Sequence, residues 1–403
     1  DRALAFVDGL EPSPPFQFVE NERGLSETGL SAFLVAVGGS STEQAGSPPK
    51  RLTALADAED RLDRQIHELD RHNQWLLSQC VKTRDAWFAD LDCTSVEAFE
   101  STVESYRETF AEDAIGRFDD DLLPFNARSR LLYDAEGWKG YEVVLDVFPG
   151  LFAYGILGIP DGISDGEQRP VVVCQHGLEG RSQVVFDGSR DAYNDFGAEL
   201  CKQGFVVFAP QNLYIFKDRF RSLQRKAYPL KKTLFSLIIP QHQQITDWLK
   251  SLPYVDPEHI AFYGISYGGK TAMRVPPLVS NYCLSICSAD FNEWVWKNVS
   301  SDNNYSYARK SEYEIFEWDL GSTFNYAEMA RLICPRPFMV ERGHYDGVAP
   351  DETVAYEYAK VQRHYDLLGI GDRTELEVHD GGHEIRLEGT LRFLRKHLEW
   401  PER

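Results

Sequence analysis

The sequence lacks any apolar run of about 18 residues, the length that a helix needs to span a bilayer. It also lacks an excess of positive charge, because 42 Lys and Arg residues stand against 63 Asp and Glu residues, for a formal net charge of −21. A surface this negative repels the phosphates of nucleic acids and anionic lipid headgroups. We therefore expect no membrane span and no nucleic-acid partner.

The cysteines provide neither a disulfide framework nor a zinc cluster. They are odd in number, scattered, and mostly inside apolar segments. Their positions are Cys80, Cys93, Cys174, Cys201, Cys283, Cys287 and Cys334. Cys283 and Cys287 could place two ligands on one helix face, but no His or carboxylate pair accompanies them at metal-site spacing. We expect buried free thiols and no metal.

The chain begins at Asp1, and no charged segment followed by an apolar one opens it. We expect a soluble protein, either cytoplasmic or exported with a leader already removed. The sequence indicates neither the compartment nor the oligomeric state.

The composition is that of a globular protein with a large core. Of the 403 residues, 43% are apolar and 26% are charged, which excludes a disordered or fibrous chain. A chain of this length accommodates one large catalytic domain and an accessory region.

Residues 1–128 are expected to form a mostly helical accessory region. A Gly/Ser/Pro-rich segment at 37–50 predicts a loop or mobile connection. After it, apolar residues recur at three- and four-residue spacing, at Leu55, Leu62, Ile66, Leu69, Leu76 and Leu77. This spacing predicts an amphipathic helix. A second helix begins near Ser95, where a Glu three positions beyond Thr94 suggests a capping box.

From residue 129 onward the pattern changes to strands that alternate with helices. Two β-rich segments are separated by Pro149 and Gly150, and the sequence "RPVVVCQHG" predicts a strand buried on both faces. Further strand-like segments lie at 204–210, 259–265, 282–290, 335–343 and 374–382. Helical patterns separate them. We therefore expect an α/β fold, with a mainly parallel, doubly wound sheet flanked by helices across residues 129–403.

One serine, Ser266, is enclosed by small residues in "GISYGG". A predicted strand enters this segment and a predicted helix leaves it, the context that a GxSxG nucleophile turn requires. Gly264 and Gly268 would let strand and helix approach closely, and the Tyr267 N–H would face a developing oxyanion. The bare pattern occurs by chance in roughly one chain in seven, so the context carries the prediction.

A serine nucleophile needs a base, and His383 is the preferred candidate. It lies in the turn "HDGGHEI", after the last predicted strand and before the terminal helix. A loop of this kind, with two glycines, can reach across to Ser266. His379, at the end of the strand, is the alternative base, whereas His364 and His397 fit solvated helix faces.

The acid that orients this base is expected to be Asp346. It follows a predicted strand in "GHYDGVAP", at the carboxyl edge of the sheet where binding groups of parallel sheets collect. Asp290, which ends an earlier strand, and Glu341 remain alternatives. The order Ser266, Asp346, His383 is the one that nucleophile-elbow hydrolases use.

The second half of an oxyanion hole is expected after the strand that ends at Gln175. There "CQHGLEG" makes a turn, and the Leu178 N–H could face the serine, with Glu179 as the alternative donor. An ordinary turn would explain the glycines but not His176, which we expect to contact the substrate.

These four motifs, "CQHGLEG", "GISYGG", "GHYDGVAP" and "DGGHE", resemble in sequence and order the α/β-hydrolase superfamily. Within it the chain is similar to the branch that holds dienelactone hydrolases, acetyl xylan esterases and prolyl-oligopeptidase-like catalytic domains. The resemblance covers about residues 130–403. It implies catalysis by Ser266, Asp346 and His383 without a cofactor. True dienelactone hydrolases use a cysteine nucleophile, so their substrate is not implied here.

Two insertions are expected to cover the site. The first, at 211–240, is basic and carries Lys217, Arg219, Arg221, Arg225, Lys226, Lys231 and Lys232. A solvated or internally paired patch is favoured over an anion-recruiting rim. The second, at 290–326, is aromatic and carries Trp294, Trp296, Tyr305, Tyr307, Tyr313, Phe316 and Trp318.

Such aromatic side chains pack a cap or bind sugar rings and aromatic acyl groups, and we assign Trp294 and Trp296 to substrate binding. The predicted function is a serine carboxylic-ester hydrolase that forms an acyl-enzyme, acting on a small-molecule or carbohydrate ester. A peptidase of the same fold and a non-catalytic interaction protein on a hydrolase scaffold are the alternatives.

Overall fold

The structure is a computed structural model of the chain, and it describes residues 27–39, 58–302, 304–310 and 317–402. The chain divides into two compact units between Glu68 and Leu69. The first unit contains α2 (Glu27–Ala36) and the start of α3 (Ala58–Trp87). Residues 40–50 of the predicted loop and Leu55 lie outside the described residues.

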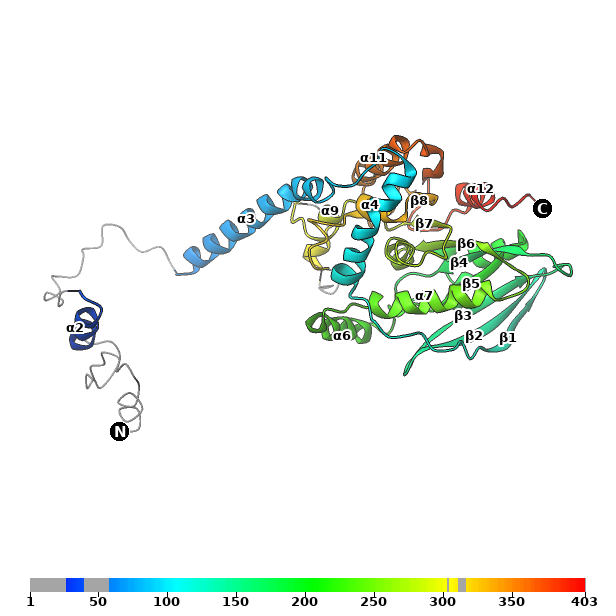
Figure 1. The fold of residues 1–403 in the computed structure, drawn as a ribbon, viewed down its shortest axis with the longest axis horizontal. Coiled ribbons are helices and arrows are strands. Elements are labelled where there is room, and N and C mark those ends of the chain that lie inside the picture. The colour runs from blue at the N-terminus through cyan, green and yellow to red at the C-terminus, as the bar shows by residue number, and fades with distance from the viewer. Residues whose placement is uncertain (1–26, 40–57, 303, 311–316, 403) are drawn as a thin grey trace. The chain divides into compact units, whose positions relative to one another are not determined.

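The second unit is built on a twisted, mixed sheet of nine described strands (Figure 1). The strands are β1 (Arg128–Ala135), β2 (Trp138–Phe148), β3 (Leu151–Pro160), β4 (Arg169–Gln175), β5 (Val206–Pro210), β6 (Val255–Ile265), β7 (Leu284–Ser288), β8 (Phe338–Gly343) and β9 (Thr374–His379). Their order is β1-β2-β3-β5-β4-β6-β7-β8-β9. The pairs from β1 to β5 are antiparallel, and those from β5 to β9 are parallel.

Helices cover both faces of this sheet. The helices of the second unit are α4 (Val96–Thr109), α5 (Phe196–Lys202), α6 (Asp218–Ala227), α7 (Phe235–Lys250), α8 (Tyr267–Ala272), α9 (Trp294–Asn298), α10 (Tyr326–Ile333), α11 (Asp351–Leu367) and α12 (Glu388–His397), with the π-helical turn η1 (Phe110–Ile115) after α4. On one face α4, α7, α10 and α11 share a core cluster with Val171 and Val173 of β4. On the other, α5 and α12 pack with Val172. Successive side chains of a strand point to opposite faces, so β4 is buried from both sides.

The predicted mainly parallel α/β fold is confirmed, as are the strands that it named. β1 was not predicted, because six of its eight side chains are exposed and no apolar alternation marks it. The helix near Ser95 is also present as α4, but its N-cap is Ser95, whose hydroxyl accepts the Ala98 N–H at 3.1 Å, and not Thr94.

The predicted boundary near residue 128 stays a prediction. Phe99, Val103 and Phe110, which precede this boundary, share one hydrophobic cluster with strand residues. Within the second unit, the buried Arg84 of α3 has Nη2 3.6 Å from Glu293 Oε1 and Nε 3.5 Å from Glu328 Oε2. Residues 69–128 therefore belong to the same compact unit as the sheet.

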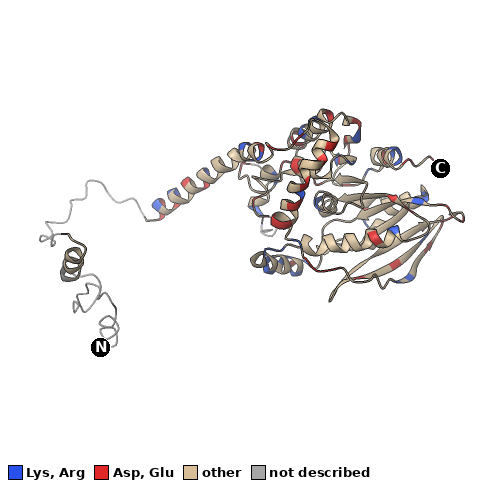
Figure 2. Ribbon diagram, in the orientation of Figure 1, with Lys and Arg blue, Asp and Glu red and all other residues tan. Residues whose placement is uncertain are grey.

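Acidic residues recur along α4, at Glu97, Glu100, Glu104 and Glu108 (Figure 2). Part of the basic insertion is paired with the adjoining acidic segment, because Lys231 Nζ lies 2.7 Å from Asp113 Oδ1 of η1. Such internal pairing is one of the two arrangements that the sequence favours for these basic residues. In the described ranges, no helix is both long and apolar enough to cross a membrane.

Candidate active site

Ser266 occupies a strained turn between β6 and α8. Its backbone has φ 60° and ψ −119°, a conformation that few L-residues adopt. A Cβ on Gly268 would lie 2.2 Å from the carbonyl oxygen of Gln175, and one on Gly264 would lie 2.3 Å from that of Gly268. The turn therefore excludes any side chain at either glycine, as the sequence predicts.

The carboxylate of Asp346 accepts a hydrogen bond from the imidazole of His383. His383 Nδ1 lies 2.9 Å from Asp346 Oδ1, which also accepts the Val348 N–H at 2.9 Å. Asp346 follows β8 and is 4% exposed, whereas His383 follows β9 and is partly open to solvent. This bond fixes the tautomer with the proton on Nδ1, which leaves Nε2 as an acceptor.

Ser266 and the Asp346 turn border the same small cavity of about 20 Å³, since Val348 lines it together with Ser266 and Tyr267. Within the described part of the chain, no hydrogen bond joins Ser266 Oγ to His383. Such bonds are often long before substrate binds. The hydrogen bond from Ser266 to the His383 imidazole thus stays a prediction.

The alternative acids and base are engaged elsewhere. Asp290 is bound by the ammonium of Lys297 and by the Tyr326 hydroxyl, at 2.7 Å for the latter. Glu341 is fully buried and accepts the Tyr263 hydroxyl at 2.8 Å. His379 Nδ1 accepts the Gly381 N–H at 3.1 Å, so this histidine closes the turn that leads to His383.

The loop after β4 runs beside the serine. A Cβ on Gly177 would lie 2.9 Å from Ser266 Cβ and 3.4 Å from its Oγ. The Gly177 N–H donates to the Tyr193 hydroxyl at 3.1 Å, and the Glu179 N–H to the Tyr214 carbonyl at 2.9 Å. The Leu178 N–H has no acceptor among the described residues. Of the two predicted donors in this loop, Leu178 is therefore the one available for an oxyanion.

The expected contact between His176 and a substrate stays a prediction. Its side chain is fully buried. Nδ1 lies 2.8 Å from the Gly177 carbonyl oxygen, and Nε2 accepts the Asn212 N–H at 3.1 Å. Burial lowers the pKa of His176 to about 4, so the ring is neutral. It joins the loop after β4 to the start of the basic insertion.

The two tryptophans assigned to substrate binding occupy different environments. Trp294 is 4% exposed and lines the cavity beside Ser266. Trp296 is 48% exposed and does not line that cavity. Tyr313 and Phe316 lie outside the described residues. Trp294 thus forms part of the cavity wall, and Trp296 faces solvent.

A buried group of charges near the serine was missed by the sequence reasoning. Lys270 and Arg274 lie four and eight residues after Ser266, and both contact Glu317, with Lys270 Nζ at 3.4 Å. Burial lowers the pKa of Lys270 to about 8. Burial opposes ionisation of Glu317, but Arg274 and Lys270 hold its pKa below the usual value. The four-residue spacing of the two cations was the available signal.

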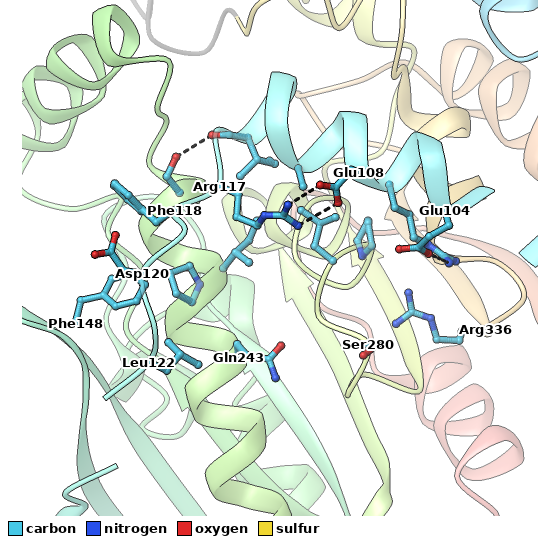
Figure 3. Close-up of a pocket in the computed structure, with 18 of the residues that line it drawn as sticks. Glu104, Glu108, Arg117, Phe118, Asp120, Leu122, Phe148, Gln243, Ser280 and Arg336 are labelled. Atoms are coloured by element: carbon cyan, nitrogen blue, oxygen red, sulfur yellow. Dashed lines mark hydrogen bonds and ion pairs between the residues drawn. The ribbon is translucent and has the colours of Figure 1, made fainter. Parts of the chain in front are cut away.

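A larger cavity of about 550 Å³ lies between α4 and α7, far from this chemistry (Figure 3). Arg117 and Glu108 both line this cavity and point toward one another, with Arg117 Nη2 2.6 Å from Glu108 Oε1. Its lining includes Ser280 and Arg336, which precede β7 and β8. It therefore opens at the amino ends of the parallel strands, opposite the edge that bears Ser266.

The described residues contain no group of three or more His, Cys, Asp or Glu side chains placed to hold a metal ion. Five cysteines are buried, and all seven have free thiols. Ser266, His383 and Asp346 supply a hydroxyl, an imidazole and a carboxylate at this edge of the sheet.

Known proteins resemble the chain in both sequence and fold. The pattern described as "Dienelactone hydrolase family" matches residues 155–282. "Putative hydrolase YtaP" of Bacillus subtilis (strain 168) is 25% identical over 244 residues, which cover 57% of this chain and 79% of that protein.

Two solved structures share the fold. A glucuronoyl esterase from Solibacter usitatus has a TM-score of 0.60 at 13% identity, covering 75% of this chain and 94% of that one. A "putative acetyl xylan esterase" from Bacteroides fragilis NCTC 9343 has a TM-score of 0.59 at 15% identity, covering 75% and 89%. The chain therefore has the fold of these esterases, and residues 155–282 of it match the dienelactone hydrolase family.

Proposed function

We propose that the chain is a serine hydrolase that cleaves a carboxylic ester through an acyl-enzyme. The hydrogen bond between His383 and Asp346, at the same sheet edge as the strained turn of Ser266, is the observation that carries this proposal. The three groups come from loops after different strands, as catalytic groups of parallel sheets do.

In the proposed reaction Ser266 Oγ attacks the ester carbonyl carbon, and its proton passes to His383 Nε2. Asp346 holds the imidazole in the required tautomer and stabilises the imidazolium. The N–H groups of Leu178 and Tyr267 donate to the oxyanion. His383 then protonates the leaving alcohol, and water attacks the acyl-serine with His383 again as the base.

The substrate class that we propose is an acylated carbohydrate or an aromatic ester. The structural neighbours include proteins named as acetyl xylan and glucuronoyl esterases. Trp294 lines the cavity beside Ser266, where its aromatic face can contact a sugar or aromatic ring. Both observations support ring-bearing esters over small aliphatic ones.

Labelling with a fluorophosphonate tests the nucleophile. We expect stoichiometric modification of Ser266 at pH 8, abolished in Ser266→Ala and in denatured protein. Absence of labelling in folded protein would contradict the proposal and favour a non-catalytic interaction protein. Faster turnover of an aminoacyl-nitroanilide than of p-nitrophenyl acetate would instead indicate a peptidase. Acetylated and feruloylated sugars then test the substrate class.

A further inference from the structure

We propose that Glu341 is a positioning residue that ties the His383 loop to the strand bearing the nucleophile; this inference rests on the function proposed above. Glu341 lies on β8, five residues before Asp346, and its side chain is fully buried. It does not face the reacting atoms. Its contacts reach two other segments that carry the predicted catalytic groups.

The first contact is with the return of the His383 loop. Glu341 Oε1 accepts the N–H groups of Arg386 and Leu387, at 3.1 and 3.2 Å. Leu387 has φ 68°, in the left-handed region that a leucine rarely adopts. Two hydrogen bonds to one buried carboxylate oxygen hold this strained end of the loop, three and four residues beyond His383.

The second contact is with β6, the strand that ends at Ser266. Glu341 Oε2 accepts the Tyr263 hydroxyl at 2.8 Å, and that hydroxyl also lies 3.1 Å from Thr390 Oγ1 of α12. In the parallel register Tyr263 pairs with Ile286, and Ile286 pairs with Met339. Glu341 lies two residues beyond Met339, so its side chain and that of Tyr263 lie on the same face of the sheet. One carboxylate thus joins β6, β8 and the His383 loop.

Other contacts also hold this loop, and at its end the Arg386 side chain pairs with Glu388 at 3.2 Å. The Tyr345 N–H donates to the Gly381 carbonyl at 3.0 Å, and the Ile385 N–H to the Ala192 carbonyl at 2.9 Å. Burial raises the pKa of Glu341 to about 7, which the Tyr263 hydrogen bond opposes. Ionisable groups whose pKa is shifted in this way are often found at functional sites. Without Glu341 the imidazole would keep Asp346, but the backbone of Arg386 and Leu387 would lose its two hydrogen bonds to β8.

Glu341→Ala and Glu341→Gln separate this role from simple stabilisation. The glutamine oxygen can still accept both N–H groups, so we expect its kcat for p-nitrophenyl acetate to stay within about 3-fold of the wild type. In Glu341→Ala we expect kcat to fall about 10- to 100-fold with KM nearly unchanged, because the imidazole is displaced. Glu377→Ala is the matched control, since Glu377 Oε1 accepts the Gly389 N–H at 3.0 Å, beyond the loop.

Hydrogen exchange gives a readout that does not depend on activity. We expect faster exchange at Arg386 and Leu387 in Glu341→Ala, and only at the start of α12 in Glu377→Ala. Unchanged exchange at Arg386 and Leu387, or an unchanged kcat in folded Glu341→Ala, would overturn the inference. An equal loss of kcat in Glu377→Ala would do so too.

If Glu341→Ala does not fold, Tyr263→Phe replaces it, and an unchanged kcat there would count against the link to β6. A wild-type protein that is not labelled by fluorophosphonate would contradict the proposed function alone, because the exchange result still tests Glu341.

Discussion

Gly343 and Gly381 approach so closely that a Cβ on Gly343 would lie 2.2 Å from the Gly381 carbonyl oxygen. Gly343 ends β8 and Gly381 begins the loop that carries His383. The same Cβ would lie 2.3 Å from the Gly382 carbonyl oxygen. The distance between the Asp346 and His383 segments is therefore set by backbone packed against backbone, and not by long side chains.

A methyl group at this contact tests that geometry. We expect Gly343→Ala to lower kcat at least about 10-fold, because the His383 loop must move away from β8. Gly347→Ala is the control: a Cβ there meets nothing within 4 Å, and Gly347 has no positive φ. Its kcat is expected to match the wild type. Equal kcat values for the two variants, both folded by circular dichroism, would show that the contact is not needed.

Substituting His383 and His379 in turn tests which of the two histidines acts as the base. We expect His383→Gln to lower kcat by about 10³-fold or more, because no group remains to take the serine proton. His379→Gln should keep most of the activity, since His379 Nδ1 only accepts the Gly381 N–H. Ester hydrolysis by purified variants measures both. A larger loss in His379→Gln would make His379 the base.

Removal of Glu317 should destabilise the fold strongly. Glu317 pairs with Arg274 and Lys270, which are both buried, so Glu317→Ala removes the carboxylate that both cations contact. We expect a loss of about 3–5 kcal/mol in the free energy of unfolding, measured by urea denaturation. The double variant Arg274→Met with Glu317→Leu should lose less. A loss below about 1 kcal/mol in Glu317→Ala would mean that water or other groups replace the pair.

Stability should fall as pH decreases below the ordinary range of histidine. Burial lowers the pKa of His242 to about 3, whereas an unfolded histidine titrates near 6.5. The unfolded state therefore binds the proton first, and the stability present above pH 6.5 is lost as pH falls toward 3. Between pH 6.5 and 4 one such group accounts for about 3 kcal/mol.

Replacement of this histidine checks the assignment. We expect the unfolding free energy of His242→Leu to depend less on pH across this window than that of the wild type. The exposed His67 provides the control variant, His67→Ala, with the wild-type slope. Identical slopes for all three proteins would show that His242 does not titrate as described.

Much of the parallel half of the sheet could be predicted because its strands are continuously apolar, as at Val171, Val172 and Val173. The pairing of Asp346 with His383 was also anticipated, because both follow strands that end at one edge. β1 escaped prediction because an exposed edge strand carries no apolar pattern. The burial of His176 escaped prediction because it depends on a loop that returns 36 residues later, at Asn212.

The buried charges show a second limit of the sequence. Glu317 is 43 residues from Arg274, and no local pattern connects them. Glu341 appeared only as an alternative acid, because its partners Arg386 and Leu387 are reached through the fold. Such long-range polar contacts have no period along the chain, so they emerge only from the coordinates.

The guanidinium of Arg84 has a practical consequence for dissecting the molecule. It is 2% exposed and donates to the Gly321 carbonyl, within reach of Glu293 and Glu328. A fragment trimmed to the first strand would discard this cation and leave two acidic side chains enclosed without it. Recombinant fragments should therefore retain Arg84, and fragments that lack it are expected to aggregate.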